Sequence, residues 1–324
     1  MVIALIPVVA VLFAASLLIG PAGIGLREAF LALGTGQGGD VALIMREIRL
    51  PRALLGVMVG GSLGLAGAAM QGWLRNPLAE PGLIGASSSA ALGAVVALQS
   101  GLAASFALAL PLMALGGALA SVLLIAALAG PRGSAVVLIL AGVAISAIGA
   151  ALTSLLLSLS PNPYAVAEIV FWMMGSLADR SIVHVWLALP IMAAGAALLA
   201  TTGRGLDALT LGEDAAATMG IPMRRLRICL IVGTAAVVGA ATAVAGAVGF
   251  VGLVVPHLLR PWVQGVPSRL LPASALGGAA MVLAADIAVR LIAPDRDLKL
   301  GVLTALVGAP LFLHLIWKMR RGEA

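Results

Sequence analysis

The sequence predicts an all-α integral membrane protein with about ten transmembrane helices and an inverted internal repeat. Of its 324 residues, 62% are apolar and only 10% are charged, whereas soluble domains carry about 25% charged residues. The apolar residues form long stretches, near the roughly 20 residues that a helix needs to cross a bilayer. No segment alternates polar and apolar residues strongly enough to indicate a membrane β-barrel.

Ten apolar stretches, bounded by charged residues, proline or glycine, are the candidate spans. In chain order they are residues 2–25, 52–74, 82–99, 106–130, 135–159, 185–203, 228–248, 250–259, 270–293 and 300–317. The stretch 250–259 is too short for a full crossing, so we expect a half-helix or a buried segment enclosed by protein. The first stretch lacks the basic start and clear cleavage site of a signal peptide, so we interpret it as a retained span.

The net charge of +6 does not indicate nucleic-acid binding. The arginines lie between apolar segments and form no basic face with interleaved aromatic residues. In membrane proteins such charges orient the spans. Cys229 is the only cysteine, so the chain can form neither an internal disulfide nor a cysteine-based metal site.

A faint internal repeat appears at an offset of 179 residues. Val59-Gly60 matches Val238-Gly239, and Ala66-Gly67-Ala68 matches Ala245-Gly246-Ala247. The copies lie five spans apart, so they would run in opposite directions, as in many transporters. Chance matching among glycines and alanines is the alternative.

The second span carries a small residue at every fourth position. This spacing lets helices pack closely in lipid. The positions are Gly56, Gly60, Gly64, Ala68 and Gly72. They include the pattern Gly-x-Ser-x-Gly at 60–64, which an intramembrane enzyme could use only with a strand-to-helix elbow and a histidine partner. Helix packing explains the pattern more simply.

The most hydrophilic internal segment runs from Gly203 to Arg227. If this segment and the basic C-terminal end both face the cytoplasm, an even number of spans places the N-terminus there too. Thr210 and Glu213 fit a capping box at the start of a short helix. Gly220 would end that helix, and Pro222 would open the next one. The segment predicts two short helices with a tight corner, which either lie on the membrane surface or dock into a soluble partner.

Residues 211–220, Leu-Gly-Glu-Asp-Ala-Ala-Ala-Thr-Met-Gly, resemble the coupling loop of the FecCD-type permease family, whose members import iron siderophores, haem or vitamin B12. Further stretches agree in order from about residue 45 to the C-terminus. They are 49–52 (Arg-Leu-Pro-Arg), 71–72 (Gln-Gly), 76–85 (Asn-Pro-Leu-Ala-Glu-Pro-Gly-Leu-Ile-Gly), 140–143, 172–175, 249–257 (Gly-Phe-Val-Gly-Leu-Val-Val-Pro-His), and Ala285-Asp286 with Arg290. The positions that carry the structural motifs of this resemblance are Asn76, Pro77, Gly85, Gly252, Pro256 and His257.

The resemblance implies the fold of a type II ABC importer permease, as a single transmembrane domain over 1–324 with a cytoplasmic coupling loop at 204–227. Family members work as homodimers in the bacterial cytoplasmic (inner) membrane, with two cytoplasmic ATPase subunits and a periplasmic substrate-binding protein. This chain has no phosphate-binding loop, because neither Lys299 nor Lys318 follows a glycine. We therefore expect no enzyme activity and no cofactor in this chain, with ATP and Mg on the partner ATPase.

The resemblance also assigns site residues. The ATPase-coupling positions are Thr210, Gly212, Glu213, Ala216, Met219, Gly220 and Pro222. Arg49, Arg52 and Arg290 match outer positions that pair with acidic residues of the binding protein, although Arg290 could instead pair locally with Asp286. Ser134, Ala135 and Val136 match the cytoplasmic gate, with apolar residues where hydroxyls occur in the family.

Other functions fit the sequence less well. A proton-coupled carrier needs a chain of buried acids or histidines, and Asp286 is the only clear intramembrane acid, with Arg290 able to neutralise it. Within the importer family the cargo remains open, with a ferric siderophore preferred and haem or vitamin B12 as alternatives. No metal site is expected in the chain.

Overall fold

The computed structural model describes residues 1–20, 22–36, 38–106, 108–129, 135–293 and 298–320. Within these ranges the chain is helical and has no strand, so the predicted fold class is confirmed. Six helices are long and apolar enough to cross a membrane, and four further apolar helices have 10–17 described residues. The protein is therefore a multi-pass membrane protein.

The helices follow one another in a simple order along the chain. They are α1 (Val2–Leu18), α2 (Leu26–Thr35), α3 (Asp40–Leu43), the π-helix η1 (Ile44–Arg49), α4 (Leu50–Leu74), η2 (Pro81–Ile84), α5 (Ala86–Gln99), α6 (Leu102–Ser105), α7 (Ala109–Ala129), α8 (Ala135–Ser158), α9 (Pro163–Met173), α10 (Ile182–Ala200), α11 (Gly203–Leu209), α12 (Glu213–Thr218), α13 (Met223–Ala245), α14 (Val251–Leu259), η3 (Pro261–Val263), α15 (Pro267–Ile292) and α16 (Leu300–Arg320).

Each of the ten predicted spans corresponds to one apolar helix, with ends that shift by up to several residues, and three further details differ from the sequence-based expectation. The first helix ends at Leu18, and the short helix α2 follows it. The second span extends back to Asp40 through the π-helical turn, because Arg46 does not end it: its guanidinium donates to the Ala32 and Leu33 carbonyls at 3.0 and 2.8 Å. The helix α9 was not predicted.

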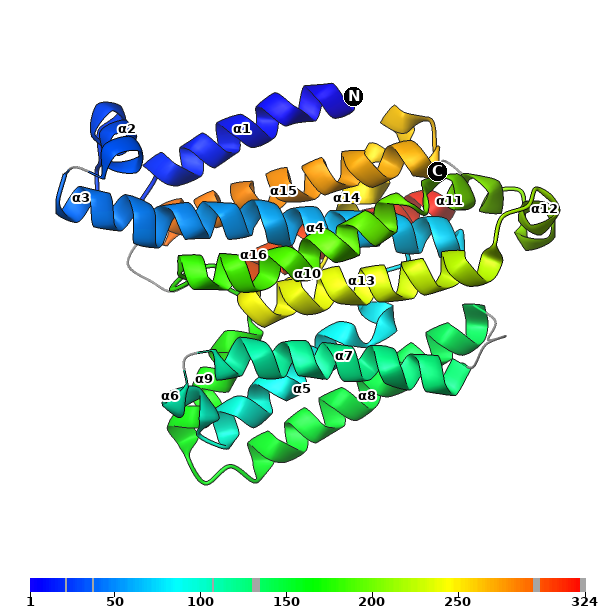
Figure 1. The fold of residues 1–324 in the computed structure, drawn as a ribbon, viewed down its shortest axis with the longest axis horizontal. Helices are drawn as coiled ribbons and strands as arrows, with labels where there is room; N and C mark the ends of the chain where they lie inside the picture. Colours follow the sequence, from blue (N-terminus) through cyan, green and yellow to red (C-terminus); the bar gives the residue numbers. More distant parts are fainter. Residues whose placement is uncertain (21, 37, 107, 130–134, 294–297, 321–324) are drawn as a thin grey trace.

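Two sets of four helices repeat the same order of lengths. The helices α4, α5, α7 and α8 form a long, short, long, long series, and α13, α14, α15 and α16 form another. Figure 1 shows α4 running away from the α2–α3 end of the molecule, whereas α13 starts at the α11–α12 end and runs the opposite way. The start of α1 and the end of α16 both point toward the α11–α12 side of the molecule, in line with the predicted even number of spans.

The packing of the two sets is reciprocal, which is the pattern expected of an inverted repeat. The first helix of each set packs against the second and third helices of the other set: α4 contacts α14 and α15, and α13 contacts α5 and α7. The sequence match at an offset of 179 is only approximate in conformation. Gly67 lies inside α4, whereas Gly246 ends α13 with a φ of 72°.

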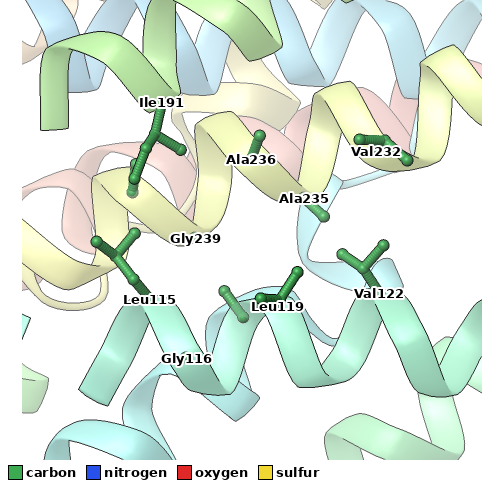
Figure 2. Close-up of a pocket in the computed structure, with 11 residues that line it drawn as sticks. Leu115, Gly116, Leu119, Val122, Ile191, Val232, Ala235, Ala236 and Gly239 are labelled. Carbon is green, nitrogen blue, oxygen red and sulfur yellow. The ribbon is translucent and has the colours of Figure 1, made fainter. Parts of the chain in front are cut away.

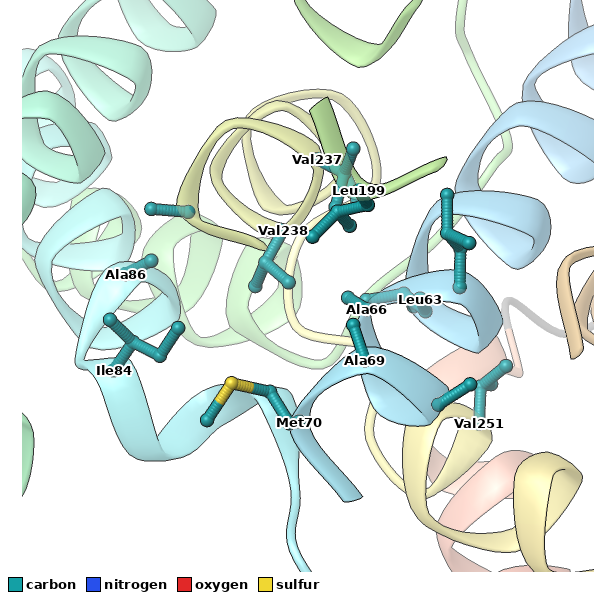
Figure 3. Close-up of a cluster of buried hydrophobic side chains, with 14 of the residues drawn as sticks. Leu63, Ala66, Ala69, Met70, Ile84, Ala86, Leu199, Val237, Val238 and Val251 are labelled. Carbon is teal, nitrogen blue, oxygen red and sulfur yellow. The ribbon is translucent and has the colours of Figure 1, made fainter. Parts of the chain in front are cut away.

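The core lies where the two sets meet. Figure 3 shows Leu63 and Met70 of α4 beside Val238 of α13, with Ile84 and Val251 at the edge of the cluster. Small residues bring the backbones together around this core, and a Cβ added at Gly60 or Gly64 would overlap backbone atoms of α15. This close approach confirms the packing role predicted for the small-residue stripe.

Candidate functional site

Two short helices, α5 and α14, begin at fully buried residues, Ala86 and Val251. Each is preceded by a residue in the left-handed region, Gly85 with a φ of 74° and Phe250 with a φ of 67°. The left-handed conformation costs a non-glycine residue about 1–2 kcal/mol, so surrounding packing must hold Phe250 in place. Gly308 of α16 supplies the room, because a Cβ there would overlap the Phe250 side chain.

A cavity of about 360 Å³ lies beside the first residues of these two helices. Its walls come from both repeats: α4, η2, α5 and α8 on one side, and α13, α14 and residues 247–249 on the other. Among the described residues that line the cavity, Glu80 is the charged one, and Ser87 and Ser146 carry hydroxyl groups. A largely apolar wall with few polar groups can admit a bulky ligand without holding it tightly.

Gln71 supplies a hydrogen-bond donor to α14 at the place where Pro256 leaves a backbone carbonyl oxygen without its usual N–H partner. Because proline has no N–H, the Gly252 carbonyl oxygen loses its normal partner four residues later. The Gln71 side chain is fully buried, and its Nε2 donates to the carbonyl oxygens of Gly252 at 3.4 Å and Leu253 at 3.1 Å. Arg260 Nη2 donates in turn to Gln71 Oε1 at 2.8 Å. The Gln-Gly and Val-Pro-His stretches of the sequence therefore meet in space.

The other predicted motif residues shape the entry to α5 and the wall of the cavity. Asn76 Oδ1 accepts from the Leu78 N–H at 2.9 Å, a turn that places Pro77 before η2. Gly85 packs on α8, where a Cβ would lie 3.0 Å from the Gly142 carbonyl oxygen. Gly252 lines the cavity itself. His257 lies in the last turn of α14 and is partly exposed.

The coupling segment contains two short helices, α11 and α12, but they are not the predicted pair, because the helix that follows the Gly220 corner is the 23-residue α13. The capping also differs from the prediction. The α12 helix begins at Glu213 with Gly212 as its N-cap, so the capping box predicted for Thr210 is wrong. Thr210 instead ends α11, and its hydroxyl donates to the Asp207 carbonyl oxygen at 2.7 Å. A threonine hydroxyl that bonds back into its own helix cannot cap the next one.

The predicted tight corner at Gly220 is confirmed. Gly220 has a φ of 83°, and its N–H donates to Ala217 O at 3.0 Å while the Ile221 N–H donates to Ala216 O at 3.1 Å. These two bonds form a Schellman motif, which requires a left-handed residue at the Gly220 position. Pro222 is the N-cap of α13 rather than its first residue.

The α12 helix turns one side into the protein and the other outward. Ala216 is fully buried, whereas Met219 is 61% exposed and Leu211, just before the helix, is 69% exposed. Glu213 ties the helix to α13 through an ion pair with Arg227 at 2.8 Å. Surface pairs of this kind stabilise by about 0–1 kcal/mol. The exposed apolar side chains on a short, fixed helix form a surface that another protein can contact.

The three outer arginines are engaged inside the protein. Arg49 is only 4% exposed and donates to the carbonyl oxygens of Leu17, Leu18 and Ala22 at 2.9, 2.8 and 2.5 Å. These are acceptors at and just beyond the C-terminal end of α1, where a cation is favourable. The docking role assigned to Arg49 remains a prediction. The structure shows in addition that Arg49 binds the end of α1 through hydrogen bonds.

Arg290, like Arg49, has internal contacts in addition to the docking role predicted for it. Its Nη1 donates to the Ser16 and Ile19 carbonyl oxygens at 2.8 and 2.7 Å, and its Nη2 pairs with Asp286 at 2.9 Å. The alternative of a local pair four residues apart is therefore confirmed. Arg52 pairs with the same carboxylate and is the most exposed of the three arginines, with 17% of its side chain accessible.

The gate residues lie largely outside the described part of the chain. Ser134 is not described, and Ala135 and Val136 are placed only as the first residues of α8, so the gate stays a prediction. Among the described residues, no group of three or more His, Cys, Asp or Glu side chains could hold a metal ion. Sequence reasoning quoted Gln71 and Glu80 within motifs but assigned neither a role.

Comparison with known proteins agrees with this architecture. The model of the FecCD transport family matches residues 8–318. The chain is 39% identical to the Fe(3+) dicitrate transport system permease protein FecD of Escherichia coli over 86% of each chain. It is 37% identical to the vitamin B12 import system permease protein BtuC of Salmonella paratyphi A, over 91% of this chain and 90% of that one.

Two further similarities extend the comparison. An uncharacterized ABC transporter permease protein, YvrB of Bacillus subtilis, is 39% identical over 86% of this chain and 80% of its own length. A solved structure described as an inward-facing conformation of a metal-chelate type ABC transporter superposes with a TM-score of 0.87 at 30% identity, over 98% of both chains.

Proposed function

Because this chain belongs to the FecCD transport family, we propose that it is the permease subunit of an ATP-driven importer that moves a ferric siderophore from the periplasm to the cytoplasm. The observation that carries the proposal is the cavity shared by the two inverted repeats, which both short helices border. Inverted repeats with interrupted helices at a central site are the usual construction of a transport pathway.

The partners of the proposed importer follow from what this chain contains. Its sequence has no phosphate-binding loop, so a separate ATPase subunit must hold ATP and Mg. The exposed side of α12, with Leu211 and Met219, is the surface we propose for that subunit. A second copy of the chain would complete the pathway, and a periplasmic binding protein would deliver cargo to the end that carries Arg52.

The relatives of this chain differ most in the cargo that their names give. One relative is named for ferric dicitrate and another for vitamin B12. The cavity lining, which is largely apolar with one carboxylate, does not favour one of these cargoes over the other. Haem or vitamin B12 import is therefore the second candidate, favoured by the 37% identity to the vitamin B12 permease.

Whole-cell uptake in a deletion strain tests the proposal. Labelled ferric siderophore, haem and cobalamin are supplied separately, and the deletion is complemented with the wild-type chain or with an empty vector. We expect loss of ferric siderophore uptake that the wild-type chain restores. Loss of haem or cobalamin uptake alone would replace the cargo, and unchanged uptake of all three would overturn the proposal.

A further inference from the structure

A basic pocket lies at the α11–α12 end of the molecule, where α10, α11 and α13 meet. It has a volume of about 280 Å³, and Arg204 and Arg225 are its two charged lining residues. Both are exposed, and the described part of the structure gives neither guanidinium a hydrogen bond or an ion pair. Arg46, Arg49, Arg52, Arg227 and Arg290, in contrast, each have a partner within the protein.

One face of α13 leads from this pocket toward the middle of the helix. Arg225, Cys229, Val232, Ala236 and Gly239 follow one another at intervals of four, three, four and three residues, which places them on the same side of a helix. At 1.5 Å per residue this stripe is about 21 Å long. Half of the hydrocarbon core is about 15 Å thick, so the stripe reaches from the interface past the bilayer centre.

An apolar groove occupies the deeper part of this stripe. Figure 2 shows Val232, Ala235 and Gly239 of α13 facing Leu115 and Leu119 of α7 across the groove. Its volume is about 290 Å³, and every lining residue is apolar.

The groove is open toward its surroundings rather than enclosed. Leu119 of α7 is 59% exposed, and Gly116 is exposed as well. The groove also touches Ile191 of α10, and Thr201 and Thr202, which directly follow the end of α10, line the basic pocket. A polar pocket and an apolar groove are thus joined by the same two helices.

We propose that this surface binds one anionic glycerophospholipid, with its phosphate on Arg204 and Arg225 and an acyl chain in the α7–α13 groove. Arginine forks match phosphate oxygens geometrically and stay charged. Basic pockets between transmembrane helices on the cytoplasmic side bind anionic headgroups. If these arginines served only to orient the protein in the membrane, basic residues at this end would suffice. Neither a pocket around them nor an adjoining apolar groove would be needed.

The bound lipid would also stabilise the position of the coupling segment relative to α13. Ile221 and Pro222, which follow the Gly220 corner, line the same pocket as the two arginines. A phosphate held between Arg204 of α11 and Arg225 of α13 would link the helices on either side of α12. This proposal concerns the lipid alone and does not depend on the cargo of the importer.

Thermal unfolding and native mass spectrometry of the full chain in neutral detergent test the proposal. Phosphatidylglycerol should raise the melting temperature and remain bound, whereas phosphatidylcholine and inorganic phosphate should do neither. Equal stabilisation by phosphatidylcholine would show only general lipid solvation and overturn the proposal. Equal stabilisation by inorganic phosphate would replace the lipid with a free anion.

Matched variants locate the site. Arg204→Gln with Arg225→Gln should weaken phosphatidylglycerol binding by at least about tenfold, which corresponds to about 1.4 kcal/mol. Arg224→Gln removes a neighbouring exposed arginine that does not line the pocket, so it should bind like the wild type. Unchanged binding in the double variant would overturn the headgroup assignment.

Filling the groove tests the acyl chain separately. A Cβ at Gly116 meets nothing within 4 Å, so Gly116→Leu should fold and occupy the groove. We expect weaker phosphatidylglycerol binding with an unchanged oligomeric state by light scattering. Unchanged lipid binding would overturn the acyl-chain assignment, and a changed oligomeric state would assign the groove to a second copy of the chain.

Discussion

Arg52 and Asp286 lie 234 residues apart in the sequence, yet Arg52 Nη2 is 2.9 Å from Asp286 Oδ1. Arg290 pairs with the other oxygen of the same carboxylate at 2.9 Å, and Asp286 is only 2% exposed. One buried acid therefore joins the start of α4 to the end of α15.

Asp286→Asn should destabilise the protein strongly. Removing one member of a buried ion pair leaves its partner charge uncompensated, which costs about 3–5 kcal/mol. Urea or thermal unfolding in detergent measures the loss. Glu47→Gln, which removes an exposed acid from the continuous helix that carries Arg52, is the control and should change stability by less than about 0.5 kcal/mol. Equal stability of the two variants would contradict a structural role for the pair.

Arg49→Lys separates the internal role of Arg49 from the docking role. The lysine keeps the charge but cannot present the planar fork that reaches three carbonyl oxygens. We expect a loss of about 1–3 kcal/mol from unsatisfied buried acceptors, with faster hydrogen exchange at the end of α1.

The control for this variant is Arg27→Lys, on the exposed surface of α2. Binding-protein affinity measured on the same samples completes the test. Unchanged exchange in α1 together with weakened docking would reverse the assignment of Arg49 from anchor to docking residue.

Gly67→Ala should be far more damaging than Gly61→Ala, although both lie in α4. A Cβ at Gly67 would overlap the backbone of Gly252, whereas a Cβ at Gly61 would lie 3.5 Å from the Ala275 carbonyl oxygen, an ordinary contact. Overpacking of this kind costs about 1–3 kcal/mol. Melting temperatures of the two variants decide the point, and similar values would mean that α4 and α14 do not pack as closely as described.

Gln71→Leu should destabilise by about 1–3 kcal/mol, because the carbonyl oxygens of Gly252 and Leu253 lose their buried donor. The Pro256→Ala background supplies a backbone N–H to the Gly252 carbonyl oxygen, so the effect of Gln71→Leu should be smaller there. A double-mutant cycle measures this coupling. Strict additivity would show that Gln71 acts independently of the proline.

Gly220→Leu should uncouple ATP hydrolysis from transport. The corner has a φ of 83°, which costs a non-glycine residue about 1–2 kcal/mol, while the added side chain itself meets open space. Gly220→Asn is the matched control, because asparagine tolerates this conformation better. The measurement is ATPase activity with and without transport in reconstituted vesicles, and normal coupling in the leucine variant would exclude the corner from energy transfer.

Sequence reasoning correctly identified the features that depend on neighbouring residues. Apolar stretches located ten helices, and Gly220 located the corner before α13 because its conformation is set by local turn chemistry. The same reasoning failed at Thr210, whose hydroxyl donates to the Asp207 carbonyl oxygen of its own helix and does not cap the next helix. It also missed α9 and the extension of the second span to Asp40.

The sequence by itself thus determined that this chain belongs in a lipid bilayer, where ten of its apolar helices lie and where the chain turns before α13. Only the tertiary structure showed that Arg49 and Arg290 donate hydrogen bonds to the end of α1. It also showed that Gln71 donates to the helix α14 where Pro256 lacks an N–H, and that Asp286 forms ion pairs with two arginines. The reason is physical: hydropathy and turn preference act over a few residues, whereas a buried donor finds its acceptor only after distant helices have packed.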